Sequence, residues 1–489
     1  MRWLPWALWA GSALVCALTV HHGIQPNDEG LMLQAAARIA DGQVPYRDFW
    51  WFYPPGQPLL LGGLDVLLGP SLLPWRVVRV AADATVALLA WRLALRGGAP
   101  PGAALAAWLA ATLAMAYPTG PHPFPITLAL CLGALLAHER HPAAAGALAG
   151  VAAFWRIEFA AYLCLGILLA HPRAVFALTA AGVAAALYLP IVALAGPGTS
   201  FDLLIRYPVA DFGDYQSLPF PLRYDGPLNT SSLGGFLSDS AENLLVHFLP
   251  LVLVAGLAAG LIAAGLTRER WRIAPAVFAL GMLHYLIARA DVFHTAPLTV
   301  MVAVLAAWAA ARLTVLAVVA LVALGYTVVE GLDRVWLTLR EDTVALELPG
   351  AAGIRVPPAT ARDVTATVRA VQARTAPGEP IYVATRRADR VTAGDPLLYV
   401  LARRPNPTRY DIQAPGVVTS APVQREIVGD LERARPAVVV RDTSPVTAAP
   451  EPNAAGRSSG VRLLDDYLAA AYRPLERHGD LVVLVRVEE

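Results

Sequence analysis

Long stretches without any acidic residue or arginine constrain the fold of this chain more than any other feature. Each of them can cross the hydrocarbon core of a bilayer, which is ~30 Å thick and takes about 20 residues of helix. The stretches cover residues 3–20, 97–137, 174–201, 243–267 and 292–311. The sequence therefore predicts a polytopic α-helical membrane protein.

Hydrophobic segments in the first two thirds of the chain predict about 11 membrane spans, judged by length and lack of charge. They lie at residues 3–20, 75–95, 101–117, 122–138, 142–157, 158–171, 173–195, 244–266, 273–288, 295–311 and 313–330. The first span is expected to be retained, because no small-residue cleavage site follows it. Residues 57–69 are apolar but too short to cross, which favours a re-entrant or interfacial helix.

The composition changes after Glu330, because more than half of all charged residues lie beyond it. Short apolar runs there are typical of buried strands, and two further segments have helical periodicity. The expected strands are 381–385, 437–441 and 481–487, and the expected helices are 424–433 and 461–472. We therefore predict a transmembrane module over residues 1–330 and a small soluble α/β domain over residues 331–489. Residues 443–460, rich in Ser, Pro and Ala, are expected to form a flexible loop.

Arginines between the spans orient the chain, because cytoplasmic loops carry an excess of basic residues. If successive spans alternate in direction, the following residues lie on one side of the membrane: Arg2, Arg92, Arg96, Arg140, Arg173 and the cluster at residues 268–272. That side is expected to be cytoplasmic, which places the loops 21–74 and 196–243 and the C-terminal domain outside. The exceptions on the outer side are Arg206, Arg223 and Arg289. All basic residues are Arg and Ala is abundant, as in GC-rich bacterial genomes, so we expect a bacterial inner membrane.

Other composition features exclude several classes of site. A net charge of +1 gives no support for nucleic-acid binding. Cys16, Cys131 and Cys164 each lie in an apolar segment without a Cys or His partner at ligand spacing, so they are expected in the core. His21 and His22 are adjacent and do not share a helix face, which argues against a metal site there.

A polar segment after the first span carries the most informative residues. Asp28 and Glu29 come first, then Gly42–Asp48 with the sequence Gly-Gln-Val-Pro-Tyr-Arg-Asp, and then Pro54–Gly56. Asp28 and Glu29 have a structural interpretation, since acidic residues favour the N-terminus of a helix. That interpretation leaves the rest of the ordered pattern unexplained.

Taken together, these elements resemble the first extracytoplasmic loop of the GT-C superfamily of integral-membrane glycosyltransferases. The similarity is to the branch of aminoarabinose transferases and protein O-mannosyltransferases. In that branch an acidic pair opens the loop, a Gly-x-x-Pro-Tyr-x-Asp segment and Pro-Pro-Gly follow, and a short helix ends in Gly, here Gly69. Elsewhere the resemblance depends on the number of spans and the C-terminal soluble domain.

The resemblance implies transfer of a sugar from a polyprenyl-phosphate donor to an acceptor hydroxyl of the cell envelope. The transfer would occur on the outer side, where no nucleotide sugar is available and a lipid must deliver the sugar. An inverting displacement needs a carboxylate to accept the acceptor proton. By match to the motif, Asp28 is the candidate base and Asp48 a secondary candidate for contact with sugar or acceptor. Glu29 is expected to orient Asp28, or to hold a divalent cation with it if one is used. No other cofactor is implied.

Two further groups of ionisable residues are candidates for binding the donor phosphate. Arg289, Asp291 and His294 lie between two spans, in an arrangement that resembles one in related bacterial members. Arg recognises phosphate through its fork of donors, so Arg289 and His294 are expected to face the phosphate, with Asp291 orienting one of them. Arg156 and Glu158 interrupt an apolar stretch and are expected to line the donor cavity. A polar turn and an internal ion pair are the structural alternatives.

The remaining polar segments are less informative. Loop 196–243 is expected to cover the site through Tyr207, Asp211, Asp214, Tyr215 and Arg223, and residues 396–411 are assigned an accessory role in acceptor binding. Two functional alternatives stay open: a transporter or flippase of lipid-linked sugars, and a non-catalytic envelope-assembly protein. The sequence identifies neither the sugar, hexose or pentose, nor the acceptor.

Overall fold

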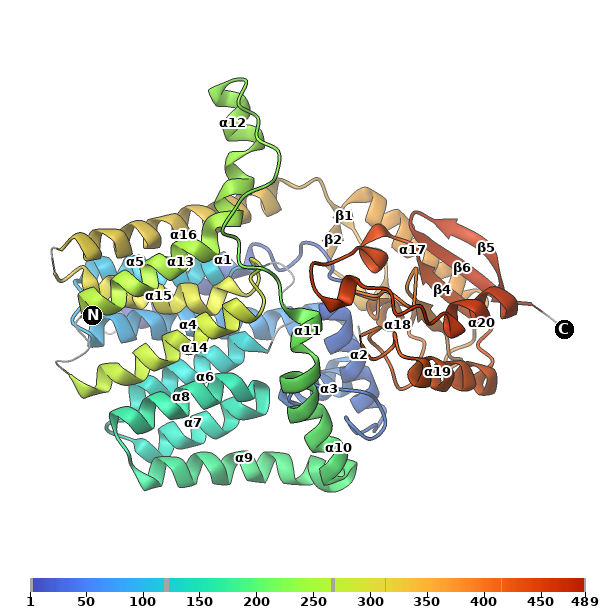
Figure 1. Ribbon diagram of the computed structural model, residues 1–489, viewed down its shortest axis with the longest axis horizontal. Helices are drawn as coiled ribbons and strands as arrows, with labels where there is room; N and C mark the ends of the chain where they lie inside the picture. The colour runs from blue at the N-terminus through green and yellow to red at the C-terminus, as the bar shows by residue number, and fades with distance from the viewer. Residues whose placement is uncertain (1–2, 118–122, 265–268, 313, 415, 488–489) are drawn as a thin grey trace.

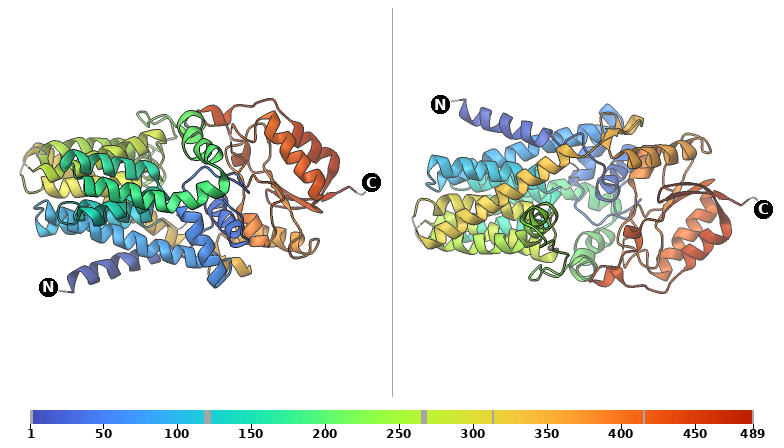
Figure 2. Two further views of the ribbon diagram at one scale, coloured as in Figure 1. Left: turned by 90° about the horizontal axis from the view of Figure 1, so that it is seen from below. Right: turned by 90° about the horizontal axis from the view of Figure 1, so that it is seen from above.

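A helical bundle occupies one end of the molecule and an α/β part the other, with the two chain termini at opposite ends (Figure 1). The computed structural model describes residues 3–117, 123–264, 269–312, 314–414 and 416–487. The two rotated views show the same division (Figure 2). Arg268 of the expected cytoplasmic cluster lies outside the described residues, as do the ends of the expected spans at 122, 265–266 and 313.

The apolar segments fold into the helices that the sequence predicts, most of them a few residues shorter. They are α1 (Leu4–Ala17), α4 (Leu72–Arg96), α5 (Pro101–Met115), α6 (Phe124–Ala137), α7 (Pro142–Trp155), α8 (Ile157–Ala170), α9 (Ala174–Ala195), α13 (Ala241–Ala264), α14 (Ile273–Ala288), α15 (Thr295–Ala309) and α16 (Val315–Arg340). Among the described residues, four segments are long and apolar enough to cross a bilayer: Ala174–Ala195, Ala241–Ala263, Arg270–Ala288 and Val315–Arg340. The protein is therefore a multi-pass membrane protein.

Small side chains hold the bundle together. The core shared by these helices is dominated by alanine, with Ala90, Ala107 and Ala306 among its fully buried members. Small residues let helix backbones approach closely, which is how helices pack where the surroundings are already apolar. Cys16 and Cys131 are buried in this bundle, as predicted, whereas Cys164 is half-buried; all three are free thiols.

Several short helices and one π-helix accompany the bundle, most of them at the end that faces the α/β part. They are α2 (Asp28–Ala40), α3 (Gly56–Leu68), α10 (Pro197–Phe201), the π-helix η1 (Asp202–Asp211), α11 (Gly213–Gln216) and α12 (Leu233–Asp239). The stretch at residues 57–69 is thus helical, and it ends at Gly69, whose φ of 78° suits glycine. In Figure 1, α12 projects upward from the bundle.

The α/β part contains a four-stranded sheet of order β3-β4-β6-β5. Its strands β3 (Tyr382–Ala384), β4 (Val438–Asp442) and β6 (Leu481–Arg486) confirm the three predicted ones. β3 and β4 are parallel, whereas β6 pairs antiparallel with both β4 and β5 (Tyr472–His478). The sequence did not predict β5, because its residues are mostly polar and exposed. It also did not predict the short hairpin of β1 (Val344–Ala345) and β2 (Arg355–Val356), because two residues are too few to give a pattern.

Four helices cover the sheet: α17 (Pro358–Gln372), α18 (Leu397–Ala402), α19 (Ala421–Ala434) and α20 (Leu463–Ala471). The last two were predicted. α16 runs through residue 330, the expected domain boundary, and ends at Arg340. Residues 443–460, expected to be a flexible loop, contain the two 3-10 turns η4 (Pro445–Ala448) and η5 (Ala454–Gly456).

A buried ion pair joins the two parts through α2. The Arg38 guanidinium donates to both carboxylate oxygens of Asp411, over 2.6 and 2.8 Å, and to the Thr408 carbonyl over 2.6 Å. Both side chains of the pair are less than a tenth exposed. Gly30 of α2 lies so close to α18 that a Cβ there would overlap the Leu397 backbone. Residues 396–411, which were assigned an accessory role in acceptor binding, therefore include residues that pack directly against the helix that begins with Asp28.

We expect Asp411→Ala to lower the free energy of unfolding by about 3 kcal/mol, because it leaves the Arg38 guanidinium buried without a carboxylate. Thermal unfolding of the purified chain in detergent measures this. The matched control is Asp466→Asn, which removes a carboxylate from an exposed pair with Arg462 and should change little. Equal effects of the two variants would contradict a structural role for the Arg38–Asp411 pair.

The Asp395 carboxyl at the start of α18 makes the stability of the α/β part depend on pH. Burial, helped by the charge of Asp442, raises the pKa of Asp395 to about 7. An acid with a raised folded-state pKa loses its stabilising protonated form as pH rises, so stability should fall between about pH 4 and pH 7 and then level off. We expect Asp395→Asn to lose less thermal stability than the natural chain between pH 5 and pH 8. A steeper loss in the variant would contradict this assignment.

Candidate active site

One cavity of about 1130 Å³ opens between the helical bundle and the α/β part. Its walls come from the start of α2, the aromatic segment at residues 52–54, the α7–α8 junction, η1 and α11, the α14–α15 turn and the α/β part. Among the predicted site residues, those that line it are Asp28, Arg156, Glu158, Arg289, Asp291 and His294. Residues far apart in the sequence thus meet at one place, whereas Glu29 and Asp48 do not line this cavity.

Asp28 is the first residue of α2 and presents its carboxylate at the cavity wall. The side chain is half-buried, and Gln25 Nε2 donates to its Oδ2 over 3.3 Å. The positive end of the helix dipole stabilises a carboxylate at this position. The structure therefore combines the two interpretations of Asp28, because the same residue begins a helix and faces a cavity.

Glu29 points away from the cavity into a fully buried ion pair. Arg76 of α4 donates to both of its carboxylate oxygens over 2.8 Å. The same guanidinium donates to the carbonyls of Val20, His22 and Gly23, at 2.9, 3.2 and 2.8 Å. Both side chains of the pair are 0% exposed. The pair fixes the end of the segment before α2. Glu29 therefore orients this segment and is not placed to contact a ligand in the cavity.

Asp48 also has a local structural partner. Its carboxylate accepts hydrogen bonds from Arg47 and from the Val44 amide, at 2.8 and 2.7 Å. The hydrogen bond from Arg47 holds the pKa of Asp48 below its ordinary value. These contacts close the turn in Gly42–Asp48 at the molecular surface, and Asp48 contributes nothing to the cavity walls.

Arg156 and Glu158 form an ion pair at the junction of α7 and α8. Arg156 has an extended backbone, with φ −150° and ψ 106°, which ends one helix and starts the next. Its Nε donates to Glu158 Oε1 over 2.5 Å. The guanidinium lies 5.0 Å from the centre of the Tyr285 ring and 5.5 Å from that of Phe159. One guanidinium is thereby held at the cavity wall by a single carboxylate and two aromatic faces.

Arg289, Asp291 and His294 form a connected group in the turn between α14 and α15. Arg289 Nε donates to Asp291 Oδ2 over 2.9 Å, and His294 Nδ1 donates to Asp291 Oδ1 over 2.6 Å. Burial raises the pKa of Asp291, but its hydrogen bonds with His294 outweigh this and hold the pKa below its ordinary value. Asp291 thus holds the Arg289 and His294 side chains together in this turn.

Several lining residues were not found from the sequence. Tyr285 is buried, and its hydroxyl has no hydrogen-bond partner among the described residues. Tyr162 and His284 are hydrogen-bonded over 2.6 Å. His284 was detectable as a lone ionisable residue inside an apolar segment. Glu451 lies in a Pro- and Ala-rich loop, with no local signal for a site.

The expected cover, loop 196–243, reaches the cavity through η1 and α11. Tyr215 lines it, whereas Tyr207, Asp211, Asp214 and Arg223 are not among its lining residues. Arg206 pairs with Asp202 and Asp211 at the surface, at 2.9 and 2.8 Å. Tyr207 instead packs against Trp50 and Phe52, with ring centres 5.2 and 5.5 Å apart.

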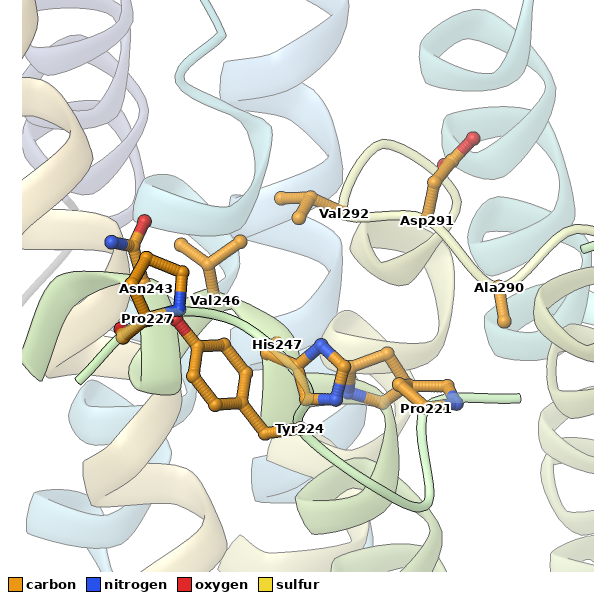
Figure 3. Close-up of a pocket in the computed structure, with 10 residues that line it drawn as sticks. Pro221, Tyr224, Pro227, Asn243, Val246, His247, Ala290, Asp291 and Val292 are labelled. Atoms are coloured by element: carbon orange, nitrogen blue, oxygen red, sulfur yellow. Dashed lines mark hydrogen bonds between the residues drawn. The ribbon is translucent and has the colours of Figure 1, made fainter. Parts of the chain in front are cut away.

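A second, smaller pocket of about 410 Å³ adjoins the same turn. Figure 3 shows the Tyr224 and His247 rings beside each other, with the Asp291 carboxylate pointing away from them. Their ring centres are 5.1 Å apart. Asp291 and Val292 line both pockets.

No group of three or more His, Cys, Asp and Glu side chains suited to a metal ion occurs among the described residues. Asp28 and Glu29, the residues suggested for a divalent cation, point to different surroundings. Glu29 already binds Arg76 through both oxygens. The carboxylates of Asp28 and Glu29 are therefore not placed to hold a divalent cation between them.

Several solved chains share this fold, among them two transferases. ArnT from Cupriavidus metallidurans, crystallised with undecaprenyl phosphate, matches with a TM-score of 0.53 and 15% identity over 99% of this chain and 98% of its own. The Archaeoglobus fulgidus oligosaccharyltransferase, tethered to an acceptor peptide, matches with a TM-score of 0.53 and 12% identity over 91% of this chain and 70% of its own. The chain has the GT-C fold. At these identities the GT-C likeness concerns the fold alone. No family model and no curated protein sequence matches the chain.

We expect Glu29→Gln to destabilise the GT-C fold of this chain by about 3 kcal/mol, because Arg76 would keep a buried charge without its carboxylate. Thermal unfolding followed by tryptophan fluorescence measures the change. Glu347→Gln is the matched control, since Glu347 is 78% exposed in its side chain and pairs loosely with Arg369. A variant Glu29→Gln as stable as the natural chain would show that the pair does not hold this segment.

Proposed function

We propose that this protein is a membrane glycosyltransferase that takes a sugar from a polyprenyl-phosphate donor and transfers it to a hydroxyl of a cell-envelope acceptor. The reaction would occur on the outer side of a bacterial inner membrane, where the lipid delivers the sugar. In this proposal the helices of the bundle make about 11 crossings, some of them with tilted or shortened helices. The α/β part, which begins after α16 ends at Arg340, lies outside the cytoplasm.

A single observation carries the proposal: the same cavity is lined by a carboxylate from α2 and by guanidinium groups from two other segments. Asp28 supplies the carboxylate, and Arg156 and Arg289 supply the guanidinium groups. Glycosyl transfer from a lipid phosphate needs these two kinds of group at one place, a base for the acceptor and cations for the leaving phosphate. The GT-C fold, shared with a structure that holds undecaprenyl phosphate, supports the same chemistry.

The reaction can be written with these residues. The acceptor oxygen forms a bond to C1 of the sugar while the bond from C1 to the phosphate oxygen breaks. Asp28 accepts the hydroxyl proton, and polyprenyl phosphate leaves with the bonding electrons. Arg289 and His294 bind the phosphate as its charge grows, and Arg156 adds a second guanidinium. A single displacement of this kind inverts the configuration at C1.

Glu29 and Asp48 take positioning roles in this proposal, since neither lines the cavity. Glu29 holds the segment before Asp28 through Arg76, with both carboxylate oxygens engaged. Asp48 closes a surface turn with Arg47. Asp28 therefore remains the base among the three acidic residues that the motif suggested.

We expect Asp28→Asn to reduce transfer by roughly 10²–10⁴-fold while the protein still inserts and unfolds at the same temperature, because the amide cannot accept the proton. The assay follows labelled sugar from a panel of polyprenyl-phosphate sugars into a cell-envelope fraction. Asp48→Asn is the matched control and should retain most activity. Full transfer by Asp28→Asn would exclude Asp28 as the base. Movement of the lipid-linked sugar across vesicles without transfer by the natural chain would favour a flippase.

A further inference from the structure

Glu451 of the α/β part makes a direct ion pair with the guanidinium that the proposed function assigns to the donor phosphate. Arg289 donates to Glu451 Oε1 from its NH2 group over 3.1 Å and to Oε2 from its NH1 group over 3.4 Å. Two acceptor oxygens on one guanidinium is also the arrangement by which Arg binds a phosphate. The carboxylate thus lies where a phosphate on Arg289 would place its oxygens.

The formal charges of the cavity walls disfavour a further anion while Glu451 remains. The described lining contains four carboxylates, Asp28, Glu158, Asp291 and Glu451, and two guanidinium groups, Arg156 and Arg289. Asp291 and Glu451 both pair with Arg289, and Glu158 pairs with Arg156. A donor phosphate adds another negative charge, and repulsion between like charges is strong in a partly enclosed cavity. One carboxylate must therefore give up its place on Arg289.

Glu451 is the carboxylate placed to leave. Asp291 is anchored in the α14–α15 turn by the His294 side chain and backbone amide, at 2.6 and 3.0 Å. Glu451 lies in the loop between the short turns η4 and η5, outside any helix of the bundle and any strand of the sheet. Its other side-chain partner is Asn453, whose Nδ2 donates to Glu451 Oε2 over 2.7 Å. Glu451 is therefore held by side-chain contacts in a loop, whereas Asp291 is also held by a backbone amide of its own turn.

The same contacts close the α/β part onto the bundle. Asn453 Nδ2 also donates to the Ser217 carbonyl over 3.1 Å, and Arg289 NH1 donates to the Gln216 carbonyl over 2.9 Å. Glu451 and Asn453 thereby tie one loop of the α/β part to α11 and to Arg289 at the cavity wall. Release of the Glu451 carboxylate removes the ion pair with Arg289 from these contacts.

We propose that Glu451 is a latch on Arg289, which the phosphate of the lipid donor displaces, so that donor binding loosens the loop at residues 449–456 from the cavity. This inference rests on the proposed function and adds the order in which the two substrates bind. The donor enters first, and the acceptor reaches the cavity past a loop that the donor phosphate has released. Glu451 is a positioning residue in this scheme and takes no part in proton transfer.

The first test measures binding of undecaprenyl phosphate to the full-length chain in nanodiscs, with undecaprenol as the probe that lacks the phosphate. Glu451→Gln removes the competing charge, so we expect its Kd for undecaprenyl phosphate to fall about tenfold, with no change for undecaprenol. The matched control is Glu476→Gln, since Glu476 forms an ion pair of similar exposure with Arg374 outside the cavity. It should leave both Kd values unchanged.

The Arg289→Gln variant separates failure of the latch from failure of the proposed function. If Arg289→Gln weakens binding and Glu451→Gln does not tighten it, the latch is wrong and the phosphate site stands. If Arg289→Gln binds as tightly as the natural chain, Arg289 is not the phosphate site, and both proposals fail.

Hydrogen exchange of the natural chain gives a second readout that needs no variant. We expect undecaprenyl phosphate to increase the exchange of backbone amides at residues 449–456, while amides of the α14–α15 turn become protected. The Ala455 amide, which donates to Asn453 Oδ1 over 2.9 Å, is a specific probe. Unchanged or slower exchange at residues 449–456 would overturn the latch.

Discussion

The buried ion pair between Glu29 and Arg76 is the interaction on which the candidate site depends. A carboxylate and a guanidinium with no exposed surface are costly unless each finds nearly all of its hydrogen bonds, and here they do. Arg76 uses its remaining donors on backbone carbonyls of the segment that precedes α2. The first residue of α2 is thereby fixed relative to α4, so that Asp28 meets the cavity while its neighbour Glu29 meets the bundle.

The α/β part completes the site. Asp411 binds Arg38 near the end of α2, the Leu397 amide donates to the Pro26 carbonyl just before its start, and Glu451 reaches Arg289. The helix that begins with Asp28 is held by the bundle on one side and by the α/β part on the other. The loops of the α/β part thus form one wall of the cavity.

The sequence predicted the helices, strands and charged residues that can be recognised from a short stretch of the chain. Runs of apolar residues predicted the helices of the bundle, and β-branched runs predicted β3, β4 and β6. Lone ionisable residues beside apolar segments identified Arg156 and Arg289, because such residues are costly there unless they are paired or used. A short stretch of sequence could not predict the direction in which a side chain points in the fold. Asp28 and Glu29 are adjacent and chemically alike, yet one faces the cavity and the other Arg76. Glu451 was missed since its partner Arg289 lies 162 positions away in the sequence.

The central claim is that one outer cavity holds both the donor phosphate and the carboxylate that accepts the acceptor proton. A cryo-EM structure of the full chain with undecaprenyl phosphate tests it most directly. The account predicts the phosphate in the cavity, about 3 Å from the Arg289 guanidinium, with Asp28 facing the adjoining space where the sugar would lie. Density for the phosphate outside this cavity, or in it but on the far side from Arg289 and with Asp28 shielded from it, would contradict the account.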